Sequence, residues 1–268
     1  MQRVLSAALA LAVLAPAAAP AADFPDIQKR GTLRVLVMLD QRRPEFFTLD
    51  HKTPGFDHEV LQRFADLHHV FLEPVPVASW DALIPALLAG KGDLIAGRFT
   101  VTESRKKLVR FSAEVFPTRN VVLTRQPHRL VQTVEELREE KVGTIKGTSM
   151  AEAIAAAAVP PANVDDGIPT GTLPDALRSG RVSAVVLGVE NDIEAQRKDP
   201  AIELGTFLGP PSSLAYGVRK EDTALLAALN NYIWSLRHST TWSRLVVKYF
   251  GDSALDVLKK ARAGTEPN

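Results

Sequence analysis

The chain has 268 residues, with 32 Lys and Arg against 31 Asp and Glu, so its formal net charge is only +1. This balance argues against a nucleic-acid-binding protein, which usually carries a clear basic excess. There is no cysteine, which excludes disulfides, thiol catalysis and zinc–thiolate sites. Hydrophobic residues make up 46% of the chain, enough for packed cores to provide the stability instead.

The first 22 residues have the build of a secretory signal peptide. Arg3 precedes an apolar stretch at 4–14, and a small, Pro-rich segment follows at 15–22. The apolar stretch is too short to span about 30 Å of hydrocarbon. We therefore expect cleavage after Ala21 or Ala22, and no later segment of the sequence approaches the length of a membrane span.

The next part of the chain alternates between strand and helix patterns. Short apolar runs at 33–39, 70–77 and 93–97 predict buried strands. Apolar residues at helical spacing over 55–67 and 80–89 predict amphipathic helices between them. Because strand and helix alternate, we expect a parallel sheet with helices on its faces.

Two further cycles of strand and helix patterns follow, and the last cycle contains few strands. The expected strands lie at 120–124, 141–145, 184–187 and 214–218. The expected helices lie at 134–140, 149–158, 173–179, 190–197, 222–236 and 242–250. The middle cycle has enough strands for a sheet of its own, whereas the last cycle has only one.

This distribution of strands predicts two α/β lobes, with the first lobe built from both ends of the chain. The predicted units are a first lobe of residues 23–119 with 211–262, a second lobe of residues 120–210, and a loose tail at 263–268. The chain would cross between the lobes near 117–122 and 207–213. Gly209, Pro210 and Pro211 suit a restrained connector at the second crossing. The alternative is two consecutive domains joined by one linker, and it requires a sheet that the last cycle cannot supply.

One continuous block carries a family resemblance. Residues 81–112 read DALIPALLAGKGDLIAGRFTVTESRKKLVRFS, which resembles the central block of family 3 of the bacterial solute-binding proteins. Further similar pieces occur in the family's order at 33–35, 55–57, 142–149, 176–184, 216–220 and 242–250. The resemblance implies a periplasmic-binding-protein-like type II fold, with two α/β lobes joined by a two-strand hinge and a ligand cleft between them.

The resemblance also implies a transport role. We expect a monomeric periplasmic protein that captures a small carboxylate-bearing solute, an amino acid or a related organic anion, for an ABC permease in the inner membrane. From the missing catalytic and metal-binding motifs and the balanced charge, we expect no catalytic residues, no cofactor, no metal and no nucleic-acid partner. Two alternatives stay open. One is an enzyme on the same scaffold, similar to periplasmic cyclohexadienyl dehydratases, with Glu190 as general acid. The other is a stand-alone sensing module, like those fused to lytic transglycosylases and sensor kinases.

The resemblance implies anion capture at the end of the strand predicted at 93–97. Thr100 and Arg105 follow that strand, and open α/β sheets bind ligands at the carboxyl ends of their strands. In the family, the residues at these two places bind the ligand's carboxylate, which an Arg fork holds through two parallel hydrogen bonds. From the other lobe, Thr148 and Ser149 open a helix whose free N–H groups also favour an anion. Without the resemblance, Arg105 would be interpreted as part of a solvated basic run.

Two aromatic residues complete the expected pocket. In the family, an aromatic residue at the place of Trp80 walls the cleft, although ordinary helix packing is the alternative for this side chain. Phe46 lies with Gln41 in the first strand-to-helix loop, where the family often places an aromatic lid.

Two positions depart from the family pattern. Gly188 stands where amino-acid binders have an Asp that pairs with the ligand's ammonium, and Glu190 is the nearest substitute. Arg98 stands where the family usually has a small residue, so the cleft would carry two guanidiniums if Arg98 faces it. We hypothesise an anionic solute without an obligatory ammonium, such as a dicarboxylate. The competing hypotheses are an amino acid whose ammonium pairs with Glu190, and an Arg98 side chain that points to solvent.

Overall fold

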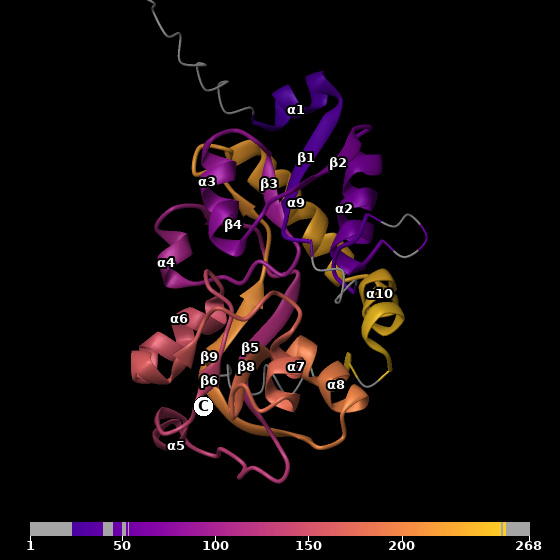
Figure 1. Cartoon of the computed structure of the whole chain (residues 1–268). Coiled ribbons are helices and arrows are strands. Elements are labelled where there is room, and N and C mark those ends of the chain that lie inside the picture. Colours follow the sequence, from indigo (N-terminus) through magenta and orange to yellow (C-terminus); the bar gives the residue numbers. More distant parts are fainter. Residues whose placement is uncertain (1–22, 40–44, 50–51, 53, 253, 256–268) are drawn as a thin grey trace, which may run out of the picture.

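The structure, a computed structural model, contains two five-stranded mixed sheets with helices packed against them (Figure 1). It describes residues 23–39, 45–49, 52, 54–252 and 254–255. The predicted leader, Gln41 and the tail at 263–268 lie outside these residues. Within the described part of the chain, no helix combines the length and apolar character needed to cross a membrane.

The first sheet has the strand order β2-β1-β3-β10-β4. Its strands are β1 (Thr32–Val37), β2 (Phe71–Pro76), β3 (Leu94–Ala96), β4 (Arg110–Phe111) and β10 (Gly217–Val218). Its helices are α1 (Phe24–Arg30), α2 (Phe56–Leu67), η1 (Trp80–Ala82), α3 (Leu83–Leu88), α4 (Glu103–Lys106), α9 (Thr223–Arg237) and α10 (Thr240–Phe250). The strands β2, β1 and β3 are parallel, as the strand–helix alternation predicts. The sheet also contains β10, which runs antiparallel to β3 and β4 because the chain re-enters this sheet from the other one.

The second sheet has the order β7-β6-β8-β5-β9. Its strands are β5 (Phe116–Arg125), β6 (Val142–Gly143), β7 (Val164–Asp165), β8 (Ala184–Gly188) and β9 (Ile202–Leu214). Its helices are α5 (Val134–Arg138), α6 (Ser149–Ala156), η2 (Pro161–Asn163), α7 (Leu173–Arg178) and α8 (Val189–Lys198). Two apolar clusters pack on it, one around Leu123 and Val185 and the other around Val122 and Val186. Since neighbouring residues of a strand point to opposite faces, this sheet is buried on both sides.

The strands β5 and β9 form the connection between the two sheets. They pair antiparallel from Phe116 opposite Leu214 to Arg125 opposite Ile202, and they lie side by side in Figure 1. The register shifts between the pairs Thr118–Ser212 and Asn120–Leu208. Gly209, with φ of +78°, and the two prolines that follow lie in this bulge. The connector expected at Gly209, Pro210 and Pro211 is therefore part of a strand, in a stretch where the ladder with β5 is interrupted and prolines, which have no N–H to donate, are tolerated.

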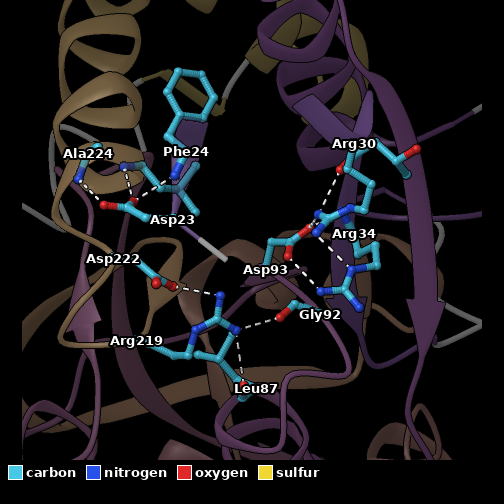
Figure 2. Close-up of polar contacts among 12 residues, drawn as sticks. Asp23, Phe24, Arg30, Arg34, Leu87, Gly92, Asp93, Arg219, Asp222 and Ala224 are labelled. Atoms are coloured by element: carbon cyan, nitrogen blue, oxygen red, sulfur yellow. Dashed lines mark hydrogen bonds and ion pairs between the residues drawn. The ribbon is translucent and has the colours of Figure 1, made fainter. Parts of the chain in front are cut away.

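Buried and half-buried charges join the elements of the first lobe (Figure 2). Arg219, which follows β10 and is 1% exposed, donates to the carbonyls of Leu87 and Gly92 and lies 2.9 Å from the carboxylate of Asp222. Asp93, which is fully buried, binds Arg34 at 2.9 Å. The arginine after β10 thereby fixes the turn between α3 and β3, the strand on which much of the candidate site depends.

Candidate functional site

Arg105 lies at the seam between the two lobes. It belongs to α4, and the side chain of Thr102 caps that helix by accepting from the N–H of Arg105. The guanidinium lies over Phe99, with Cζ 4.5 Å from the ring centre. It donates to the carbonyl of Thr100 at 2.8 Å and, across the seam, to that of Gly147 at 3.1 Å. A guanidinium has more N–H donors than these two carbonyls accept, so donors are left for a bound anion.

Arg105 keeps its positive charge although it is buried. Only 6% of the residue is exposed, and the loss of hydration lowers the pKa of its guanidinium to about 10. The nearby carboxylate of Glu152 acts in the opposite direction and favours the charged form. Arg105 is therefore cationic at neutral pH, in a position where a carboxylate would be only weakly screened by water.

Hydrogen bonds between side chains also join the lobes. The hydroxyl of Ser149, at the start of α6, donates to the hydroxyl of Thr100 at 3.1 Å. One turn along α6, Glu152 accepts from the hydroxyl of Ser104 at 2.8 Å. The first turns of α6 therefore lie against α4 and the segment after β3, and Thr100 and Ser149 lie side by side.

Thr148 caps the start of α6. Its hydroxyl donates to the carbonyl of Ile145 at 2.6 Å and accepts from the N–H of Ala151 at 3.3 Å, so it caps α6. The residue is 3% exposed. Of the two adjacent hydroxyls, Thr148 fixes the start of the helix and Ser149 reaches the other lobe.

Arg98 contacts the two aromatic residues expected at the cleft. Its Cζ atom is 5.8 Å from the ring centre of Phe46 and 5.6 Å from that of Trp80. Both aromatic residues are at least nine-tenths buried, and Phe46 also packs against Phe116 in the main core of the first lobe. The buried Nε1 of Trp80 has no hydrogen-bond partner in the described part of the chain. Phe46 thus contributes to the core as well as to the surroundings of Arg98.

Asp57 organises the turn that carries Arg98. It lies near the start of α2, and its Oδ2 accepts from the backbone N–H groups of Gly97 and Arg98 at 3.1 and 3.2 Å. Its Oδ1 accepts from the hydroxyl of Tyr216 at 3.2 Å. Burial raises the pKa of Asp57 to about 6, although these hydrogen bonds and the charge of Arg98 oppose the shift. A short-range sequence pattern does not reveal this role, although residues 55–57 are one of the pieces that resemble the family.

Glu190 lies directly beside the glycine that departs from the family pattern. A Cβ atom added to Gly188 would collide with the carboxylate of Glu190. The Oε2 of Glu190 accepts from the hydroxyl of Thr118 on β5 at 2.5 Å. The carboxylate from position 190 thus occupies the space that a side chain at position 188 would need.

A groove of about 640 Å³ runs beside the seam. Of the predicted site residues, all of which are described, Thr100 and Ser149 line it together with parts of α4, α6 and β9. Phe46, Trp80 and Arg98 form a separate cluster. Arg105 is buried, Thr148 caps α6, and Glu190 lies beside β5. Their roles in ligand binding stay predictions.

Comparisons with known proteins agree with this architecture. The family model described as bacterial extracellular solute-binding proteins, family 3, matches residues 33–252. The lysine/arginine/ornithine-binding periplasmic protein of Escherichia coli K12 is 26% identical, over 93% of this chain and 97% of its own. A mutant of ArgBP from T. maritima has a TM-score of 0.74 at 29% identity, covering 85% of this chain and 99% of its own.

A longer relative matches over part of its length. The membrane-bound lytic murein transglycosylase F of Desulfosudis oleivorans is 25% identical over 80% of this chain, and the match covers 48% of the relative. The chain thus spans about half the length of that protein. The two sheets, the paired connecting strands and the family match over residues 33–252 together lead to one assignment. The chain belongs to family 3 of the bacterial extracellular solute-binding proteins.

Proposed function

We propose that this protein binds an α-amino acid in the periplasm and delivers it to an ABC importer of the inner membrane. The observation that carries the proposal is the buried, charged Arg105 at a seam to which both lobes contribute. Arg105 would hold the solute's carboxylate, with the hydroxyls of Thr100 and Ser149 exchanging their mutual hydrogen bond for bonds to it. The periplasmic relative named for binding lysine, arginine and ornithine supports the same solute class.

The carboxylate of Glu190 favours an amino acid over a solute without an ammonium group. The hypothesis of a simple anion depended on Arg98 as a second guanidinium and on Gly188, which deprives the expected position of an acid. Glu190 fills the space next to Gly188 and is oriented by Thr118. A carboxylate there would stabilise a bound ammonium that would otherwise be costly to bury.

Titration calorimetry with the standard amino acids and their deaminated analogues tests the proposal. The key variant is Arg105→Lys, because a lysine keeps the charge but cannot form the bidentate pair. We expect the best amino acid to lose at least about tenfold in affinity, on the scale of a charge-assisted hydrogen bond. Arg30→Lys, a substitution far along the sequence in a partly exposed ion pair, is the matched control. Equal affinity in wild type and Arg105→Lys would contradict the proposal.

The two other roles have separate readouts. Because the transglycosylase relative contains a similar region, delivery and sensing need to be distinguished by uptake of labelled solute in cells with and without the protein. Binding without any effect on uptake would favour sensing. Turnover of prephenate that disappears in Glu190→Gln would favour the dehydratase-like enzyme.

A further inference from the structure

Gly147 brings the backbone of the second lobe against the backbone of the first. A Cβ atom added to Gly147 would lie 2.8 Å from the backbone N of Asp81, 3.0 Å from its Cβ and 3.3 Å from its Cα. Ordinary contacts of a Cβ atom are 3.4 Å or longer. Asp81 belongs to η1 of the first lobe, whereas Gly147 precedes α6 of the second. The two lobes therefore meet at a point that has no room for a side chain at position 147.

The turn that carries Gly147 is held firmly within the second lobe. The N–H and the hydroxyl of Thr148 both donate to the carbonyl of Ile145, at 3.3 and 2.6 Å. Ile145 also forms an antiparallel bridge with Gly167. Gly147 itself has a φ of +77°, which a residue with a side chain adopts only with strain. Because the turn is fixed at several points, a collision there is relieved by moving the lobe rather than the turn.

The backbone of Asp81 is also fixed on the side of the first lobe. The hydroxyl of Ser79 donates to the carboxylate of Asp81, and the carbonyl of Ser79 accepts from the N–H of Ala82 at 3.2 Å. Trp80, which precedes Asp81, is 9% exposed and belongs to an apolar cluster of the first lobe. The side chain of Ile145 packs against that same cluster from the second lobe. The contact is therefore part of a packed interface between two rigid pieces of backbone.

Two polar contacts beside Gly147 depend on this close approach. The guanidinium of Arg105 donates to the carbonyl of Gly147 at 3.1 Å, and the hydroxyl of Ser149 donates to that of Thr100 at 3.1 Å. Both hydrogen bonds cross the seam within two residues of Gly147. Separating the lobes to relieve a collision at position 147 would lengthen both bonds toward the distance at which they are lost.

We infer that the contact between Gly147 and Asp81 sets how closely the lobes approach, which makes Gly147 a positioning residue for the two-lobed site. A side chain at position 147 holds the lobes apart and shifts the protein toward an open form. The consequence for affinity rests on the proposed function, because it takes Arg105 and Ser149 as solute-binding residues. The separation of the lobes does not depend on what the solute is.

Matched glycine variants distinguish the contact from backbone strain. Gly147→Ala adds a Cβ atom at a φ of +77°, against Asp81. Gly180→Ala, the control, adds one at a φ of +71° in the same lobe, where nothing lies within 4 Å of it. Gly147→Asn adds the colliding Cβ atom with less strain, because asparagine tolerates positive φ better than alanine does. Thermal unfolding checks that each variant is folded.

Spin labels on opposite lobes measure the separation. The chain has no cysteine, so Lys91→Cys in the first lobe and Ala162→Cys in the second, both at exposed positions, carry the labels in every protein. Double electron–electron resonance gives the distance distributions without solute and with each of the standard L-amino acids. Stopped-flow binding of the tightest of these amino acids gives the association and release rates.

We expect wild type and Gly180→Ala to show a short separation that both Gly147 variants lose or reach only at higher solute concentration. The affinity of the Gly147 variants should fall at least about tenfold, mostly through faster release, with association rates within about threefold of wild type. A local folding defect would instead lower the fraction of protein that binds.

Each other outcome has a definite meaning. Distance distributions of both Gly147 variants that match wild type would overturn the inference and leave the proposed function intact, as would an equal loss of the short separation in Gly180→Ala. If no amino acid binds, but the short separation of wild type disappears in the Gly147 variants, the inference is supported and the proposed function is overturned. Wild type without a short separation under any condition would overturn both.

Discussion

The carboxylate of Glu190 occupies the space that a side chain at Gly188 would need. Gly188 is the last residue of β8 and Glu190 lies in the first turn of α8. The loss of an acid from one position and its presence two positions later are therefore sterically linked. Side chains at both positions cannot fit without movement.

This steric link predicts that an Asp at position 188 can take over the role of Glu190 once the side chain of Glu190 is removed. Glu190→Ala should weaken binding of the amino acid by about tenfold or more, because the ammonium loses its partner. Gly188→Asp alone should bind poorly and unfold more readily, because the new side chain meets Glu190. The double variant Gly188→Asp, Glu190→Ala should recover most of the affinity in calorimetry. A double variant no better than Glu190→Ala would show that Glu190 is not the ammonium partner.

The hydrogen bond between Ser104 and Glu152, at 2.8 Å, joins the two lobes. Removing it with Ser104→Ala should reduce the population of the closed form and speed solute release by a few-fold. Stopped-flow fluorescence of the bound protein measures this rate. Glu135→Ala changes an exposed acid within the second lobe, paired with Arg138, and should leave the rate unchanged. Equal release from wild type and Ser104→Ala would mean that this contact does not stabilise closure.

The buried Asp57 should make stability depend on pH in a specific direction. Burial raises its pKa in the folded protein to about 6, whereas an unfolded chain has a value of about 3.9. The folded state therefore binds the proton more tightly, and the stability that this proton provides is fully present below about pH 4 and lost as the pH rises through about 6.

Chemical denaturation of wild type and Asp57→Asn at pH 5 and pH 7 tests this dependence. The difference in unfolding free energy should shift in favour of wild type by on the order of 1 kcal/mol at pH 5 relative to pH 7. The pKa of Asp222, which burial also raises to about 6, contributes to both proteins and cancels. A pH-independent difference would contradict the raised pKa of Asp57.

Arg219, which follows β10, should contribute far more to the free energy of unfolding than the partly exposed Arg30. Arg219→Met removes the guanidinium paired with the buried Asp222 and the donor for two carbonyls, and should cost roughly 3–5 kcal/mol. Arg30→Met removes one of the two arginines on Asp93, is 34% exposed, and should cost less than about 1 kcal/mol. Denaturant unfolding measures both, and similar costs would contradict the assignment.

The sequence pattern predicts the parallel part of the first sheet because its strands are short apolar runs. It does not predict β9, since an exposed glycine and two prolines favour a connector, and only the pairing with β5 makes that stretch a strand. The local sequence also does not indicate the direction of β10, because that direction depends on the path by which the chain returns to the first sheet. The four-residue α4 is too short for any helical periodicity to mark it.

The candidate site was predictable where it depends on one short motif and not where it depends on distant contacts. Thr100 and Arg105 follow the same strand, and the structure joins them directly. Backbone geometry at the start of α6 decides that Thr148 caps the helix and that Ser149 contacts the other lobe. Two adjacent hydroxyl residues in the sequence do not indicate which of them does which. Asp57 reaches a turn 40 residues away in sequence, so its role emerges only once the strands are paired.

The position of β10 between β3 and β4 has a consequence for biogenesis. Every strand of the second sheet comes from one continuous stretch of chain, 116–214, whereas the first sheet must wait for residues 217–218 to fill its interior. Domains fold as units while a chain is made from its N-terminus. The second lobe can thus be complete while the earlier-made helices α1 to α3 still lack part of their core. Helices α1 to α3, although they are made before the second lobe, can therefore be among the last elements to reach their final packing.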